Sequence, residues 1–241
     1  MDNPCPDPGA AVRQQRLLTT LEGLLAIPAT AARSALNQAS DLVAATLSAD
    51  KVDIFVNDPA VDTLVALGTS DTPMGRCQVA LGLNRLSLSN GGRAAEVFHR
   101  GVPYRSAHVD ADPEELRGIK HALGVRSALM APLQVDGVRR GVLQVDSAEP
   151  ERFSPDDLAF LQAVAQWVGL VLHRAELVER VAQEAAEQAR RGAADELVTI
   201  LAHDLRGPLT PLRGHAEMIH MRAQREGHQA NLTAPRLCCA S

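Results

Sequence analysis

A histidine beside a carboxylate, near the C-terminal end, combines the residue types best suited to chemistry in this chain. His203 and Asp204 lie in a segment whose apolar residues recur at helical spacing, and Pro208 follows five residues after the histidine. At about 100° per residue the apolar positions form one stripe, and His203 points almost the opposite way. The stripe consists of Leu201, Leu205, Leu209, Leu212, Ala216 and Ile219. We therefore expect the imidazole to face solvent.

The run from Ala202 to Thr210, with Gly214 and Glu217 after it, resembles the H-box of the dimerisation and phosphoacceptor domain of sensor histidine kinases. In that family the histidine takes the γ-phosphoryl group of ATP on a ring nitrogen and passes it to an aspartate of a response regulator. The resemblance implies that His203 is the phosphoacceptor and Asp204 the assisting carboxylate. A carboxylate that accepts a hydrogen bond from one ring N–H makes the other ring nitrogen more nucleophilic.

The simpler interpretation is that His203 is an ordinary exposed histidine on a helix. The full run of the box favours the phosphoacceptor instead, and Pro208 supports it. A proline inside a helix removes a hydrogen bond and costs about 3 kcal/mol, so its presence there indicates a function. Two residues depart from the family pattern. Gly207 stands where many members carry Thr or Asn to orient a hydrolytic water, so phosphatase activity is in question, and Pro211 adds a second break in the helix.

Composition narrows the classes of protein that remain. The length of 241 residues suggests one or two domains, and with few aromatic residues the core must be built from Leu, Val, Ala and Ile. The net charge of −5 gives no electrostatic footprint for nucleic acid, so we expect no nucleic-acid partner. Four cysteines show neither metal-ligand spacing nor a disulfide framework, which favours a reduced, cytoplasmic setting with no metal.

No targeting or membrane segment is expected. The N-terminus is acidic and rich in proline, without the charged-then-apolar pattern of a signal peptide. The longest uncharged run, from Leu158 to His173, is shorter than the roughly 18 apolar residues that a membrane span requires.

The first half of the chain alternates between helix and strand patterns. Residues 12–26 and 30–47 have apolar residues at helical spacing, residues 51–56 alternate as a strand, and residues 61–67 return after a turn at Asn57-Asp58-Pro59. Residues 70–90 give no clear pattern. A short helix after Gly91-Gly92, a strand at 104–106 and a helix at 113–123 with Asp112 as N-cap follow. The clearest hairpin pairs 125–135 with 138–145 around Asp136-Gly137.

Residues 20–175 resemble a GAF domain. The resemblance is carried by the run Gly124 to Leu133, the Asp136-Gly137 turn, the run Gly141 to Asp146, and Phe153-Ser154 with the helix after it. It implies an α+β fold in which helices flank a GAF-type antiparallel sheet, here followed by a long C-terminal signalling or coiled-coil helix. The family often has a small-molecule pocket under loops on one face of the sheet.

The sequence assigns no ligand to that pocket. Cys77 cannot be placed at the chromophore-attaching position of bilin-binding relatives, and the signature of cyclic-nucleotide relatives is not apparent. His99, His108 and His121 are better read as surface histidines than as haem ligands, because their spacing does not favour a metal. The pocket is thus expected to bind an unknown small molecule, or none if the domain is only a dimerising spacer.

One helix is expected to join the two modules. Ser154 is an N-cap followed by Pro155 at the first helical position and two acids on the positive end of the dipole. Apolar residues then alternate steps of three and four, which predicts a heptad seam. Its members are Leu161, Val164, Val168, Val171, Ala175, Val178, Ala182, Ala185 and Ala189. From Pro155 to His203 such a helix is about 70 Å long. We expect a parallel homodimer through residues 155–205, with the first half of the seam packed on the sheet or on the partner; the alternative is a helix that only folds back on its own domain.

Five segments follow from these patterns. They are a disordered leader at 1–11, a GAF-like sensor domain at 12–175, a coiled-coil signalling helix at 176–196, an incomplete phosphoacceptor helix at 197–226 and a disordered tail at 227–241. The 38 residues after His203 are too few for an ATP-binding domain. No cofactor is therefore expected in this chain, and ATP would act only through a separate kinase domain.

Two functions remain open. The chain is either the sensory input and phosphoacceptor part of a two-component sensor histidine kinase, inactive alone and serving a response-regulator receiver domain, or a non-enzymatic GAF-type binding or dimerisation regulator. A redox enzyme on a GAF-like fold is disfavoured, because it needs paired reactive cysteines and Cys77 is the only cysteine inside the domain.

Overall fold

The computed structural model describes residues 8–28 and 31–232; within these, the side chains of residues 8, 10, 202–214, 216, 219, 223 and 225–232 lie outside the description. The chain forms two compact units, one that ends at Ala182 and one that begins at Gln183. The helices are α1 (Pro8–Ala26), α2 (Ala32–Leu47), α3 (Pro73–Ala80), α4 (Arg93–Arg100) and α5 (Pro155–Leu232), with short helical turns η1 (Leu88–Asn90), η2 (Val109–Ala111) and η3 (Gly118–Ala122). The strands are β1 (Lys51–Asp58), β2 (Thr63–Thr69), β3 (Arg85–Ser87), β4 (Tyr104–Ser106), β5 (Ser127–Val135) and β6 (Val138–Ser147).

The described strands form one antiparallel sheet in the order β3-β2-β1-β6-β5-β4. Its longest hairpin, β5 to β6, turns at Asp136 and Gly137, which have φ of 51° and 77°. A tight two-residue hairpin turn requires positive φ at both of its central residues, and the dipeptide Asp-Gly is favoured there because it adopts positive φ readily. The hairpin predicted around this dipeptide is confirmed.

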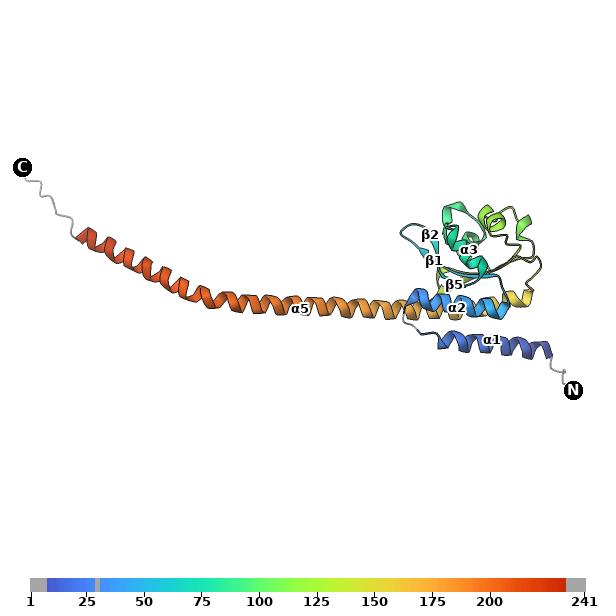
Figure 1. The fold of residues 1–241 in the computed structure, drawn as a ribbon, viewed down its shortest axis with the longest axis horizontal. Helices are drawn as coiled ribbons and strands as arrows, with labels where there is room; N and C mark the ends of the chain where they lie inside the picture. The colour runs from blue at the N-terminus through green and yellow to red at the C-terminus, as the bar shows by residue number, and fades with distance from the viewer. Residues whose placement is uncertain (1–7, 29–30, 233–241) are drawn as a thin grey trace, which may run out of the picture. The chain divides into compact units, whose positions relative to one another are not determined.

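Helix α2 and the first part of α5 cover one face of the sheet, and α1 packs on these two helices on the side away from the strands (Figure 1). Their apolar residues, among them Leu36, Val43, Leu161 and Val168, interlock with alternate residues of β1, β5 and β6 in one core. Leu161, Val164 and Val168 are fully buried at helical spacing, so the predicted seam packs on its own sheet over this length.

Helices α3 and α4 and the turns η2 and η3 cover the opposite face. Two smaller apolar clusters lie there, one around Phe55 and Met130 and one around Ile119 and Val125. Helices therefore flank the antiparallel sheet on both sides and a long helix follows it, as the sequence predicts.

Three predicted elements differ from the structure. The first helix begins at Pro8, within the expected leader of 1–11, and α5 continues to Leu232, beyond the expected helix end at 226. The helix predicted over 113–123 is wrong in extent, because only the π-type turn Gly118–Ala122 is helical. Asp112 does accept a hydrogen bond from the N–H of Glu114, but its carboxylate also binds Arg93 at 2.7 and 2.8 Å, and this ion pair ties the segment to α4.

Candidate functional site

Helix α5 begins with a reciprocal cap. Ser154 Oγ accepts the N–H of Asp157 at 3.2 Å, and Asp157 Oδ2 accepts the N–H of Ser154 at 3.0 Å. Arg16 of α1 donates to the same carboxylate at 3.0 Å. Burial tends to raise the pKa of Asp157, but the hydrogen bonds from Ser154 and Arg16 outweigh it and lower that pKa. The start of the helix predicted at Ser154 and Pro155 is confirmed, and it is held to α1.

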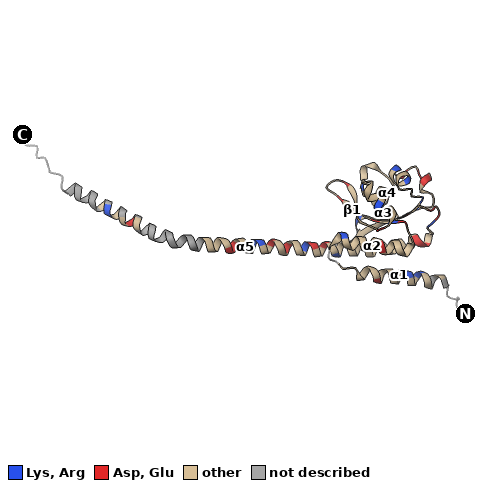
Figure 2. Cartoon of the chain, viewed as in Figure 1, with Lys and Arg blue, Asp and Glu red and all other residues tan. Residues whose placement is uncertain are grey.

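Beyond its buried face, α5 exposes a second set of apolar side chains. Leu170, Leu177 and Val181 are 54%, 42% and 64% exposed. Leu170 and Leu177, with Leu25 of α1 and Trp167, line an apolar groove of about 280 Å³ between α1 and α5. Acidic and basic residues are interspersed on the same helix (Figure 2). The described surface of α5 thus combines an apolar stripe with solvated charges.

His203 and Asp204 fall within the bounds of α5. The side chains of residues 202–214, which include His203, Asp204 and Pro208, lie outside the description. The predicted outward orientation of the imidazole therefore stays a prediction.

A buried ionic cluster lies on the face of the sheet below α3. Lys51 Nζ is 2.6 Å from Asp53 Oδ2 and 2.8 Å from Asp146 Oδ2. Lys51 also donates to Gln78 of α3, whose Nε2 donates to Asp53 at 2.9 Å. All four side chains are fully buried. The register of the sheet brings them together, because Lys51 of β1 pairs with Asp146 of β6.

Burial and ion pairing shift the pKa values of two residues in this cluster. Burial alone lowers the pKa of Lys51, but the carboxylates of Asp146 and Asp53 outweigh it and hold that pKa above its ordinary value. Burial raises the pKa of Asp146, and Lys51 offsets only part of this. Buried charges of this kind persist only when they are paired and hydrogen-bonded. Lys51 is therefore a charged, fixed centre of the domain.

Glu115 is a further buried acid near this cluster. It is 6% exposed; its Oε1 accepts the N–H of Leu116 at 2.8 Å, and its Oε2 has no hydrogen-bond partner among the described residues. Burial raises the pKa of Glu115 to about 7, with smaller contributions from the negative charges of Asp146 and Asp112. A carboxyl with this pKa changes charge near neutral pH.

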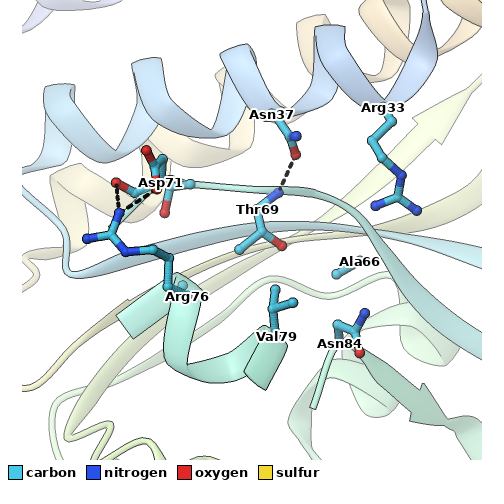
Figure 3. Close-up of a pocket in the computed structure, with 10 residues that line it drawn as sticks. Arg33, Asn37, Ala66, Thr69, Asp71, Arg76, Val79 and Asn84 are labelled. Atoms are coloured by element: carbon cyan, nitrogen blue, oxygen red, sulfur yellow. Dashed lines mark hydrogen bonds and ion pairs between the residues drawn. The ribbon is translucent and has the colours of Figure 1, made fainter. Parts of the chain in front are cut away.

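An open cavity of about 410 Å³ lies on the other side of α3, bounded by α2 and β2 (Figure 3). Arg33 and Asn37 enter it from α2, and Arg76 and Val79 from α3. Asn37 Oδ1 accepts the N–H of Thr69 at 3.0 Å, which fixes α2 against the end of β2.

A family model described as the GAF domain matches residues 32–172, more than half of the chain. The chain belongs to the GAF domain family. This assignment fits the sheet, the helices on both faces and the long final helix. GAF domains are sensory and signalling domains, so signal transduction is the general role of the folded domain.

Solved structures with the same fold support the GAF assignment. A free methionine-R-sulfoxide reductase from Neisseria meningitidis, solved with its substrate, is 19% identical with a TM-score of 0.59, and the match covers 72% of this chain and 96% of that one. The GAF domain of an Acinetobacter phosphoenolpyruvate-protein phosphotransferase is 17% identical, with a TM-score of 0.57 and coverage of 75% and 99%. A phycoerythrobilin-bound GAF domain from a cyanobacterial phytochrome is 17% identical, with a TM-score of 0.53 and coverage of 69% and 97%. No curated protein matches the chain.

The histidines and the cysteine considered as haem or chromophore ligands in the GAF domain are all exposed. His99, His108 and His121 are exposed, and His108 Nε2 contacts Glu151 at 3.2 Å. Cys77 is an exposed free cysteine. Among the described residues no group of three or more His, Cys, Asp or Glu could hold a metal ion.

The sequence reasoning missed the buried cluster of the GAF domain. Lys51 and Asp53 alternate with Val52 and Ile54, a pattern usually read as a strand with one solvated face. The available signal was a pair of opposite charges at alternate positions of one strand, with Asp146 on the strand that pairs with it. The cover that buries them comes from α3, in the stretch of 70–90 that gave no clear pattern.

One described helix segment, Pro155–Leu201, is long and apolar enough to cross a membrane by length and composition alone. Half of its most apolar window is buried inside the protein, with a mean hydropathy of 1.2. Core helices satisfy the same criteria, and α5 supplies part of the GAF core.

Proposed function

We propose that this chain is the sensory input and phosphoacceptor part of a two-component sensor histidine kinase. The GAF domain receives the signal, α5 carries it, and His203 takes up phosphate. The phosphoryl group comes from ATP held by a separate kinase domain, and His203 passes it to the receiver domain of a response regulator. The chain itself needs no cofactor and acts in the cytoplasm.

The observation that carries the proposal is the continuity of α5. The helix whose residues Leu161 to Leu172 form part of the GAF core has Pro155–Leu232 as its bounds, and the segment from Ala202 to Thr210 falls within them. A displacement of the GAF core can therefore act on the motif through one element. Transmission of this kind needs an element with two arrangements of similar energy. In the sequence of α5 the three-four spacing of apolar residues is interrupted near Gly192 and resumes at Leu197 and Leu201, which favours two such arrangements.

At His203 the proposed chemistry is nucleophilic attack by a ring nitrogen on the γ-phosphorus of ATP. The N–P bond forms as the bond to the ADP oxygen breaks, and Asp204 holds the proton on the opposite ring nitrogen. The carboxylate keeps the imidazole in the reactive tautomer and stabilises the positive charge that develops on the ring.

A parallel homodimer through α5 is part of this proposal. The exposed stripe Leu170, Leu177 and Val181 cannot be covered by the sheet, which already holds the opposite face of the helix. A second copy presenting the same stripe in parallel gives both helices an apolar partner. The groove with Leu25 and Trp167 extends this surface onto α1.

Phosphate transfer in trans tests the function. The purified chain is incubated with radiolabelled ATP and a separately supplied histidine-kinase ATP-binding domain, and labelled phosphate on the chain is measured. We expect label on the wild type, loss of label to background in His203→Gln, and retained label in the control His220→Gln on the same helix. An unlabelled wild type, or equal label in His203→Gln, contradicts the proposal.

The second candidate, a GAF regulator that binds a small molecule and exchanges no phosphate, is favoured by the cavity between α2 and α3. It predicts ligand-dependent behaviour of the chain that His203→Gln leaves intact. Absence of label on the wild type, together with ligand binding, supports it over the first.

A further inference from the structure

The cavity bounded by α2, β2 and α3 carries an excess of positive charge. Its charged lining consists of Arg33, Arg76 and Asp71. Arg76 is paired with Asp71, whereas Arg33 has no hydrogen bond or ion pair with any described residue. Figure 3 shows the two arginines entering from different walls, Arg33 from α2 and Arg76 from α3. One guanidinium is therefore left to bind an anion.

The rest of the lining suits a small organic molecule. Asn37 and Asn84 provide amide groups, and Ala66 and Val79 provide apolar contact surface. Val79 is 53% exposed, so a ligand would cover apolar area that now faces water. Concave sites that combine apolar surface with a few polar groups are typical of small-molecule binding.

The cavity wall is tied to the buried ionic cluster. Thr69, at the cavity, donates through Oγ1 to Asp53 Oδ1 at 2.9 Å. Gln78 lies on α3 between Arg76 and Val79 and contacts both Lys51 and Asp53. At Gly75 an added Cβ would lie 2.2 Å from the carbonyl oxygen of Ser70, so α3 is docked closely on the end of β2. Movement of α3 at the cavity is thus felt by Lys51 in the centre of the sheet.

We propose that this cavity binds a small organic anion, whose carboxylate or phosphate group is held by Arg33. Guanidinium groups bind both kinds of oxyanion through paired N–H donors. The role of the anion as the signal rests on the proposed sensor function, whereas its binding in the cavity does not depend on that function. Occupancy would fix α3 and, through Gln78 and Thr69, the cluster that joins β1 to β6.

Calorimetric titration of the full chain with citrate and, separately, with inorganic phosphate tests the proposal. We expect a dissociation constant of about 1 mM or tighter for at least one of them, weakened about tenfold or more in Arg33→Gln. The control Arg117→Gln removes an exposed arginine outside this cavity and should bind as the wild type does. Binding of citrate alone assigns a carboxylate, and binding of phosphate assigns a phosphate group.

No heat with either anion up to about 10 mM overturns the proposal, and so does equal affinity in wild type and Arg33→Gln. Circular dichroism of each variant confirms that it is folded. These outcomes are independent of His203: a chain that takes up phosphate in trans but binds neither anion keeps the proposed function and loses this site. A chain that binds an anion but takes up no phosphate does the reverse.

Discussion

Lys51 stands at the centre of the GAF domain as its one fully buried lysine, held by two carboxylates from neighbouring strands. Replacing it with methionine keeps much of the volume but leaves Asp53 and Asp146 without a counter-charge. Removing one partner of a buried ion pair costs about 3–5 kcal/mol. We expect Lys51→Met to lower the free energy of unfolding by this amount in urea denaturation. Arg117→Gln, at an exposed site, should change it by less than about 0.5 kcal/mol. A loss below about 1 kcal/mol in Lys51→Met would show that the cluster is not the electrostatic centre described here.

Glu115 should make stability depend on pH. Its pKa rises from the ordinary value of 4.5 to about 7 in the folded protein, because burial disfavours the charged form. The folded state therefore binds a proton more tightly than the unfolded chain. The stabilisation is complete below about pH 4.5 and is lost as pH rises through about 7.

Comparison with Glu115→Gln isolates this effect, because Lys51, Asp112 and Asp146 are common to both proteins. Between about pH 5 and about pH 8, the wild type should lose about 2 kcal/mol of unfolding free energy relative to the variant. Urea denaturation across this range measures it. A difference that does not change with pH, or one that changes in the opposite direction, would mean that Glu115 is ionised in the folded protein throughout.

At the residue scale, sequence reasoning finds what local chemistry determines. Ser154, Pro155 and Asp157 act within one turn of helix, and the cap they predict is confirmed. The cluster around Lys51 depends on strand pairing and on a cover from α3, which no local pattern reveals. For the same reason the capping role of Asp112 was predicted but its ion pair with Arg93, nineteen residues away, was not.

At the scale of elements, the contact between β1 and β6 depends on a residue without a side chain. A Cβ at Gly141 would lie 1.8 Å from the carbonyl oxygen of Phe55, in the backbone of the neighbouring strand. Because backbone cannot move aside locally, we expect Gly141→Ala to separate the two strands and to cost more than about 2 kcal/mol of stability. Chemical denaturation checks this. Gly192→Ala is the matched control, since beyond the neighbouring backbone of its own helix nothing lies within 4 Å of its added Cβ; similar losses in both variants would refute the contact.

The elements that could be predicted are those with strong local patterns. The hairpin around Asp136-Gly137 has alternating strands and a turn dipeptide suited to positive φ, and the helices of residues 12–26 and 30–47 have clear periodicity. Helix α3 was missed because it is eight residues long and contains Gly75 and Pro73. The segment from Pro113 to Leu123 has helical composition, but it forms a turn followed by η3. Asp112 ties it to α4 through Arg93 and to β4 through the hydroxyl of Tyr104.

At the scale of the molecule, the exposed stripe of α5 predicts self-association. Leu170→Glu combined with Leu177→Glu places two charges on the stripe without touching the buried face of the helix. We expect the wild type to sediment as a dimer at micromolar concentration and the double variant to sediment as a monomer with unchanged circular dichroism. Val138→Glu, at the start of β6 and 60% exposed, is the control and should stay dimeric. A monomeric wild type, or a double variant that remains dimeric, would contradict association through this stripe.

The most direct test of the central claim is the chemical nature of the phosphate that the chain carries. After incubation with ATP and a separate histidine-kinase ATP-binding domain, phosphorus NMR of the denatured chain should show one acid-labile phosphoramidate signal that is lost in His203→Gln. Either no phosphorus signal on the chain, or a phosphoramidate that persists in His203→Gln, would contradict His203 as the phosphoacceptor.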